Sequence, residues 1–130
     1  MQLHGLDHVV LRTDDVPRMR AFYEEVLGAQ LERVLEQEGL YQLRAGQALI
    51  DILSTQGSLD SKQPVQVRTS PLAHFCLQIS AASEQAVIRT LKAKGVNQSL
   101  QFAERYGATG FGRSLYILDP DGNTVELKLV

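Results

Sequence analysis

Four side chains able to bind a metal ion recur in the two halves of this 130-residue sequence. His8 and His74, 66 positions apart, each precede three apolar residues, and each half carries a carboxylate further on, Asp51 and Glu126. Two imidazoles and two carboxylates suit a borderline divalent ion such as Ni, Zn, Mn, Co or Fe(II), and they leave coordination positions free for water or substrate. His4 has no counterpart in the second half and is expected on the surface.

These four residues lie in stretches where apolar and polar residues alternate, which is typical of β-strands. Side chains alternate between the two faces of a strand, so Val9 and Leu11 lie opposite His8, and Val125 and Leu127 lie opposite Glu126. Each strand thus has one apolar face suited to packing under a helix and one face that bears a His, Asp or Glu. We expect the four polar groups to meet on one surface.

Each half continues from its histidine strand into a predicted helix. The first helix, about Asp15–Leu27, has Pro17 in its first turn and is followed by Gly28, while the second, about Ser83–Lys94, is followed by Gly95. Ser or Asp before a helix and Gly after it are the usual start and stop signals. The two glycines are 67 positions apart, so the repeat holds within one residue across strand and helix.

After each helix the hydrophobic period shortens towards two, which predicts three further strands in each half. The predicted strands are 31–35, 39–43, 48–53, 95–102, 114–118 and 124–130. The last two are joined by a turn at 119–123, rich in Asp, Pro and Gly. The prediction is an α+β protein of two βαβββ modules, one over about 4–54, the other over about 71–130, with a connecting loop at about 55–70.

Composition excludes several classes of function. Thirteen basic and fifteen acidic residues give a net charge of −2 without a run of like charge, so nucleic acid is not an expected partner. The longest apolar run is 115–118, so no membrane span or secretory signal is expected and we predict a cytoplasmic protein. The single cysteine, Cys76, cannot form an internal disulfide, and we interpret it as a small buried residue.

A glycine-rich stretch at 107–112 superficially resembles a phosphate-binding loop. It lacks the strand-to-helix context and the Lys-Ser/Thr ending, so we predict a hairpin or the rim of a cavity. Alternation puts Ser114 and Tyr116 on one face of the following strand and Arg113 at the rim, where the three could bind an anionic substrate. A solvated arginine beside an ordinary strand is the alternative.

Four motifs point to a known family: Leu-Asp-His-Val-Val-Leu at 6–11, Phe-Tyr through Val-Leu-Gly at 22–28, Leu-Ala-His-Phe at 72–75, and Tyr-Ile-Leu-Asp-Pro-Asp-Gly-Asn-Thr-Val-Glu-Leu at 116–127. With these motifs the chain resembles the vicinal oxygen chelate superfamily, which includes glyoxalase I, bleomycin-resistance proteins, fosfomycin-resistance thiol transferases and extradiol dioxygenases. The resemblance implies that the paired modules form a cupped, incomplete β-barrel around a metal ion, commonly in a homodimer.

The resemblance also assigns residues. His8, His74 and Glu126 match three metal-ligand positions of the superfamily, and Asp51 falls where glyoxalase I has a Glu. The shorter side chain leaves open whether Asp51 reaches the metal directly, through water or not at all. Arg12 matches an arginine that helps to hold glutathione in bacterial glyoxalase I.

The expected function is that of a metal-dependent lyase or isomerase, which binds a small substrate through two adjacent oxygens. In a glyoxalase-type reaction the metal stabilises an enediolate while a carboxylate such as Glu126 moves a proton between neighbouring carbons. An extradiol-type Fe(II) dioxygenase, with Asp51 uncoordinated, is the first alternative. Thiol transfer to fosfomycin, suggested by Arg113, Ser114 and Tyr116, and non-catalytic sequestration of a drug or metabolite are the others.

Overall fold

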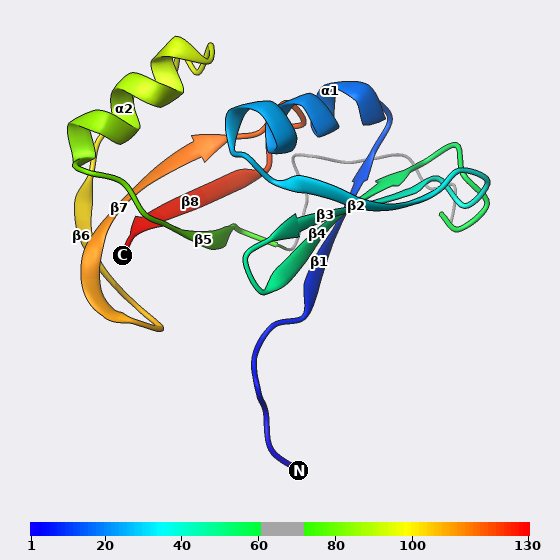
Figure 1. The fold of residues 1–130 in the computed structure, drawn as a ribbon, viewed down its shortest axis with the longest axis horizontal. Coiled ribbons are helices and arrows are strands. Elements are labelled where there is room, and N and C mark those ends of the chain that lie inside the picture. The colour runs from blue at the N-terminus through cyan, green and yellow to red at the C-terminus, as the bar shows by residue number, and fades with distance from the viewer. Residues whose placement is uncertain (61–71) are drawn as a thin grey trace. The chain divides into compact units, whose positions relative to one another are not determined.

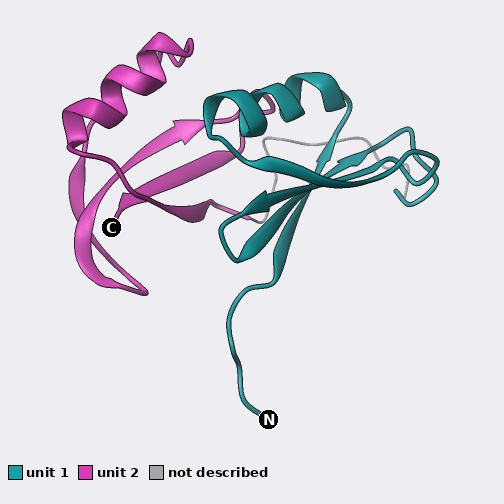
Figure 2. Ribbon diagram, viewed as in Figure 1, with its two compact units in different colours: residues 1–66 teal, residues 67–130 magenta. Residues whose placement is uncertain are grey.

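The computed structural model describes residues 1–60 and 72–130, which form two four-stranded sheets and their helices (Figure 1). The chain divides into two compact units, residues 1–66 and 67–130 (Figure 2). Each unit has the order strand, helix, three strands, so the predicted α+β class with two βαβββ modules is confirmed. The cupped, incomplete barrel depends on how the two sheets are arranged and stays a prediction. Most of the connecting loop predicted at about 55–70 lies outside the described residues.

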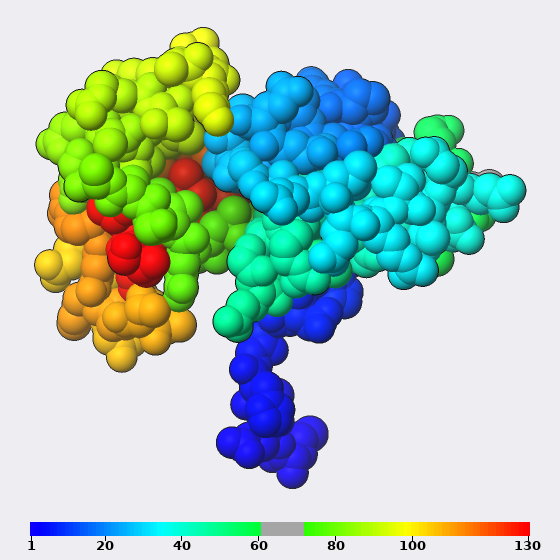
Figure 3. Space-filling model, in the orientation of Figure 1, coloured from blue at the N-terminus to red at the C-terminus, as the bar shows by residue number. Residues whose placement is uncertain are grey.

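The first unit has one mixed sheet. Its elements are β1 (His8–Thr13), α1 (Val16–Ala21), the π-helical turn η1 (Phe22–Val26), β2 (Gln30–Leu35), β3 (Leu40–Ala45) and β4 (Ala48–Ser54). The strand order is β1-β4-β3-β2, with β1 parallel to β4 and the other pairs antiparallel. Residues 1–7 precede β1 without regular structure and project as an arm (Figure 3), and His4 is exposed there as predicted.

The predicted first helix is present, but it is not α-helical throughout. Asp15 caps it by accepting a hydrogen bond from the backbone of Arg18 (3.1 Å), and the chain turns off at Gly28 with φ 83°. Between these ends, the backbone N–H of Leu27 donates five residues back to Phe22 (3.2 Å), which widens the last turn. Val26 and Leu27, at the end of this turn, are only half-buried, while Met19 and Phe22 are buried.

The second unit repeats the topology. Its elements are β5 (Phe75–Ile79), α2 (Glu84–Ala93), β6 (Ala103–Gly107), β7 (Gly110–Leu118) and β8 (Thr124–Leu129), in the sheet order β5-β8-β7-β6. Ser83 caps α2 by accepting from the backbone of Ala86 (3.1 Å), and Gly95 ends it with φ 90°, as predicted. The predicted turn at 119–123 joins β7 to β8, with Asp119 accepting from the backbone of Asp121 and Asn123.

The strand predicted at 95–102 is wrong. Residues 95–102 have no strand structure, and the edge strand is β6, which forms a hairpin with β7. The side chain of Gln98 donates to the backbone oxygen of Leu118 (3.1 Å) and accepts from its N–H (2.7 Å). A side-chain amide therefore takes the place of strand pairing at the end of β7. In the described part of the chain no helix is long and apolar enough to cross a membrane.

Candidate functional site

One face of the second sheet gathers most of the chemically active side chains of that unit. Strand register pairs Cys76 and Tyr116 with Glu126, and Ser114 with Lys128. Because register partners share a face, these residues lie on the same side of the sheet as His74, which directly precedes β5. We call this surface the His74 face; its members are His74, Cys76, Arg105, Ser114, Tyr116, Glu126 and Lys128.

His74 and Glu126 form a donor pair on this face. Nε2 of His74 lies 3.2 Å from Oε2 of Glu126, whose side chain is 11% exposed against 40% for the histidine. The other carboxylate oxygen, Oε1, accepts a 2.6 Å hydrogen bond from the hydroxyl of the fully buried Ser114. The hydroxyl thus fixes one oxygen of Glu126, while the other faces an accessible imidazole.

Arg105 extends this network, and sequence reasoning missed it. Its Nη1 donates to the backbone oxygen (2.7 Å) and the hydroxyl (3.1 Å) of Ser114. Its guanidinium lies over the ring of Tyr116, 4.4 Å from the centroid, and that ring meets His74 edge-on at 5.3 Å. The misplaced strand at 95–102 hid Arg105, because its face follows from the pairing of β6 with β7.

The remaining two members of the face differ in what they offer. Cys76 is exposed, so its interpretation as a small buried residue is wrong: it lies on the open face of β5, and the apolar sheet face is formed by its neighbours. Partial desolvation of the thiol, and next the negative charge of Glu126, nevertheless raise the pKa of Cys76, so it stays protonated near neutrality and is a poor nucleophile. Lys128 is buried and donates to the backbone oxygen of Gly110 (2.5 Å). Alternation along β8 puts Lys128 on the same strand face as Glu126.

Arg113 lies on the opposite face of β7 from Ser114 and Tyr116, which share a face as predicted. Its guanidinium pairs with Glu84 at the start of α2, with Nε 2.6 Å and Nη2 3.3 Å from the two carboxylate oxygens. The hydrogen bond to Arg113 lowers the pKa of Glu84 below its usual range. Substrate binding by Arg113 stays a prediction, and it would have to compete with this pair.

The first unit holds its own histidine and carboxylate. Asp51 is buried, and its Oδ2 accepts from Nε2 of Gln42 (3.1 Å), whereas its Oδ1 has no hydrogen-bond partner among the residues described. His8 Nδ1 lies 2.6 Å from Asp7 Oδ1, and this hydrogen bond, with a smaller contribution from the charge of Asp51, raises the pKa of His8. Asp51 is the register partner of Val10, two residues from His8 on the same face of β1.

Arg12, on that same face of β1, is already paired. Its Nε and Nη2 donate to the two oxygens of the buried Asp60, at 2.5 and 2.9 Å. The hydrogen bond to Asp60 raises the pKa of Arg12, which stays a fixed positive charge. Binding of a thiol cosubstrate by Arg12 stays a prediction.

Each unit therefore contributes one imidazole and one buried carboxylate. Within 1–60 and 72–130, no group of three or more His, Cys, Asp or Glu side chains is gathered in a way that could hold a metal. A hollow of about 400 Å³ in the first unit is lined by residues of α1, η1 and β3, among them Arg20, Glu24 and Tyr41, and by none of the predicted site residues.

Comparisons with known proteins bear on what this donor set is for. The family model described as "Glyoxalase/Bleomycin resistance protein/Dioxygenase superfamily" matches residues 5–127. "Virulence protein STM3117" of Salmonella typhimurium is 32% identical over 128 residues, which is 98% of this chain and 85% of that protein.

Solved structures agree on the fold. The crystal structure of that Salmonella protein has a TM-score of 0.73 at 30% identity, covering 99% of this chain and 98% of the other. A protein from the mobile metagenome of V. Pseudocholerae also has a TM-score of 0.73, at 26% identity, covering 99% and 96%. A lactoylglutathione lyase from Agrobacterium tumefaciens matches at 0.60 and 22% identity over 98% and 95% of the two chains, which shows a shared fold.

Proposed function

Because the chain belongs to the glyoxalase/bleomycin resistance protein/dioxygenase superfamily, we propose that it is a metal-dependent enzyme of the lyase or isomerase type. Its substrate is a small molecule that presents two adjacent oxygens. The proposed ligands are His8, Asp51, His74 and Glu126. The observation that carries the proposal is the buried oxygen Oδ1 of Asp51, which lacks a hydrogen-bond partner in the described part of the chain.

The donor set fits a divalent cation. A buried carboxylate oxygen without a donor is costly, and a cation is one of the few partners that offsets this cost. Glu126 Oε2 likewise faces an imidazole nitrogen rather than an N–H of the backbone. Nitrogen and oxygen donors in equal number suit Ni, Zn, Mn, Co or Fe(II).

Bound there, a divalent ion would supply Lewis acidity towards the substrate oxygens. The chain itself positions the proton-transfer group. The hydroxyl of Ser114 holds Oε1 of Glu126, and Arg105 holds that hydroxyl in turn, so Oε2 is the oxygen left to accept or return a proton. A carboxylate fixed in this way needs little reorganisation during transfer.

Metal analysis tests the proposal. We expect His8→Ala and His74→Ala each to abolish stoichiometric uptake of Ni, Zn, Mn or Fe(II), measured as metal per chain after dialysis. His4→Ala is the matched control, because His4 is exposed in the N-terminal arm. Unchanged metal content in either of the first two variants would contradict the ligand assignment.

One contact favours a second candidate, an extradiol-type Fe(II) dioxygenase. Gln42 already occupies Oδ2 of Asp51. If this hydrogen bond keeps Asp51 off the metal, His8, His74 and Glu126 form the two-histidine, one-carboxylate triad of such oxygenases. The two candidates differ in their dependence on Asp51, since the triad keeps its affinity for Fe(II) when Asp51 is replaced by Asn.

We further propose that the protein acts as a cytoplasmic homodimer, as expected from the sequence and its resemblance. Sedimentation equilibrium of the purified chain tests the dimer. A single species of one-chain mass across the micromolar range would contradict it.

A further inference from the structure

Two cations of the His74 face, Arg105 and Lys128, form no ion pair within residues 1–60 and 72–130. Lys128 is only 5% exposed, and its ammonium donates to a single neutral acceptor, the backbone oxygen of Gly110. An ammonium has three donors, and burial without an opposite charge is costly. The face therefore contains a buried positive charge that lacks a close counter-ion in this part of the chain.

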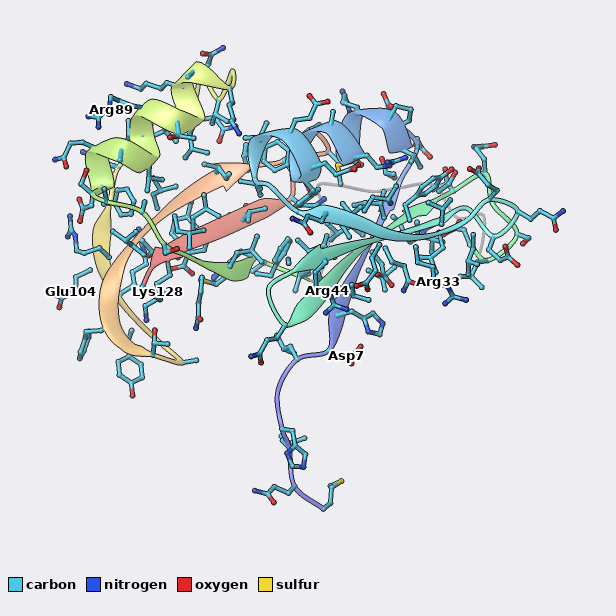
Figure 4. All side chains as sticks on the ribbon, viewed as in Figure 1. Asp7, Arg33, Arg44, Arg89, Glu104 and Lys128 are labelled. Carbon is cyan, nitrogen blue, oxygen red and sulfur yellow. The ribbon has the colours of Figure 1, made fainter. Side chains whose placement is uncertain are left out.

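The glycine-rich hairpin makes room for this lysine. A Cβ on Gly112 would lie 2.8 Å from Cε of Lys128, and one on Gly107 would lie 3.2 Å from its Nζ. Neither glycine has a positive φ, so the backbone alone does not require glycine at either position. The stem of Lys128 thus runs from β8 across β7 towards β6, over a strip without side chains (Figure 4 labels Lys128 on this sheet).

Arg105 approaches the same strip from the other side. It is the register partner of Gly112, and it reaches Ser114, which is the register partner of Lys128. Its two bonds to Ser114 come from Nη1 alone, out of the five N–H groups of a guanidinium. The other N–H groups of Arg105 lie on the same face of the sheet as the ammonium of Lys128.

The charges of the face do not cancel. Glu126 is its one carboxylate, and its two oxygens lie next to Ser114 and His74 rather than next to either cation. Two cations against one carboxylate leave a net positive charge beside the proposed proton-transfer group. Arg and Lys together are the usual means of binding a carboxylate or phosphate group, through a planar fork and a point charge.

We propose that Arg105 and Lys128 form an oxyanion subsite that binds a carboxylate or phosphate substituent of the substrate beside Glu126. The inference rests on the proposed function and narrows it: the substrate is a small oxygenated acid, held by its anionic group on the His74 face. The glycine-rich stretch at 107–112 serves this subsite by leaving space for the lysine, rather than by wrapping phosphate in its backbone.

Anion binding by the full chain, freed of metal with a chelator, tests the subsite independently of the metal site. Inorganic phosphate and succinate are titrated separately, and binding is followed by NMR shifts of backbone amides in β6, β7 and β8. We expect saturable binding of at least one probe by the wild type. Lys128→Met, which keeps the apolar stem, and Arg105→Gln should each weaken it at least about tenfold, since a hydrogen bond to a charged group contributes roughly 1.5–3 kcal/mol.

Two further variants separate charge from folding. Gly112→Ala keeps both cations but displaces Lys128, and it should weaken binding to a similar extent. Lys92→Met removes an exposed lysine of α2 and should leave the affinity unchanged. Phosphate bound more tightly than succinate identifies a phosphorylated substrate, and the reverse order identifies a carboxylic acid.

Absence of binding by the wild type, or full affinity in Lys128→Met or Gly112→Ala, would overturn the subsite. A failure of the proposed metal chemistry is recognised separately. It would appear as unchanged metal content in His8→Ala and His74→Ala, whatever the result of the anion titrations.

Discussion

Replacing Asp51 by Asn separates a metal ligand from a structural carboxylate. The change keeps the size of the side chain and one oxygen that can accept from Gln42, and it removes the negative charge. Asp51 is only 3% exposed, and its Oδ1 has no hydrogen-bond partner among the described residues. In the metal-free protein the substitution therefore removes a buried negative charge that is poorly compensated. Function and stability then make opposite demands on this position.

The expected magnitudes follow from this geometry. An unpartnered buried polar group costs about 1–3 kcal/mol, and the charged hydrogen bond from Gln42 loses about 1 kcal/mol when its acceptor becomes neutral. The free energy of unfolding of metal-free Asp51→Asn should therefore equal that of the wild type or exceed it by up to about 2 kcal/mol. Metal at a hundred times its Kd stabilises the wild type by about 2.7 kcal/mol; a hundredfold weaker affinity reduces this gain to about 0.4 kcal/mol.

Denaturant unfolding with and without metal measures both quantities. Asp119→Asn is the matched control, since Asp119 is equally buried but accepts from the backbone of Asp121 and from the backbone and side chain of Asn123. That variant should lose about 1–3 kcal/mol of stability without metal and keep the full stabilisation by metal.

The reasoning is refuted if metal-free Asp51→Asn is destabilised as much as the Asp119 control while its response to metal is that of the wild type. Asp51 would then be a structural acceptor for Gln42. That result would also leave the three-ligand set of the Fe(II) oxygenase alternative as the better description of the metal site.

Two other substitutions test local contacts. Arg113→Gln should lower the denaturation midpoint at neutral pH, because it removes the ion pair with Glu84. Arg113 lowers the pKa of Glu84, so the pair stabilises the fold fully at pH values above 4.5, the ordinary pKa of a glutamate. This contribution disappears as the pH falls through the lowered pKa of Glu84. A difference from the wild type that persists well below pH 4 would argue against the pair. Gly57→Ala should cost about 3 kcal/mol, the upper end of the usual range for overpacking, since its Cβ would lie 2.3 Å from the backbone oxygen of Glu38. Gly28→Ala, where only the positive φ is unfavourable, should cost about 1–2 kcal/mol, and equal losses in the two glycine variants would contradict this account.

Local signals in the sequence were sufficient to predict both helices and most strands. Asp15, Ser83, Gly28 and Gly95 act within a few residues of the ends that they mark, so a single sequence contains what is needed to recognise them. The same holds for alternation along a strand, which placed Ser114 with Tyr116 correctly. These features depend on neighbours in sequence rather than on packing.

The errors come from contacts between distant residues. Gln98 bonds to the backbone of a residue 20 positions away, and this contact replaces the strand predicted at 95–102. The face on which Arg105 lies follows from the register of the β6–β7 hairpin. Arg113 forms an ion pair with Glu84, which lies on a helix 29 positions earlier in the sequence. No local pattern distinguishes a guanidinium that pairs with a helix from one that is available to a substrate.

The π-helical turn at Phe22–Val26 has a consequence for how the two halves can diverge. Such a turn holds one more residue than an α-helical turn of the same height, so it can take up a change of chain length by widening or tightening. A deletion of one residue there should restore regular α-helix and leave the start of β2 in place. Since α2 is regular from Glu84 to Ala93, it has no extra residue to lose. A deletion of one residue in α2 would therefore displace the chain that follows the helix. We therefore expect insertions and deletions among relatives to be tolerated more readily in the first helix than in the second.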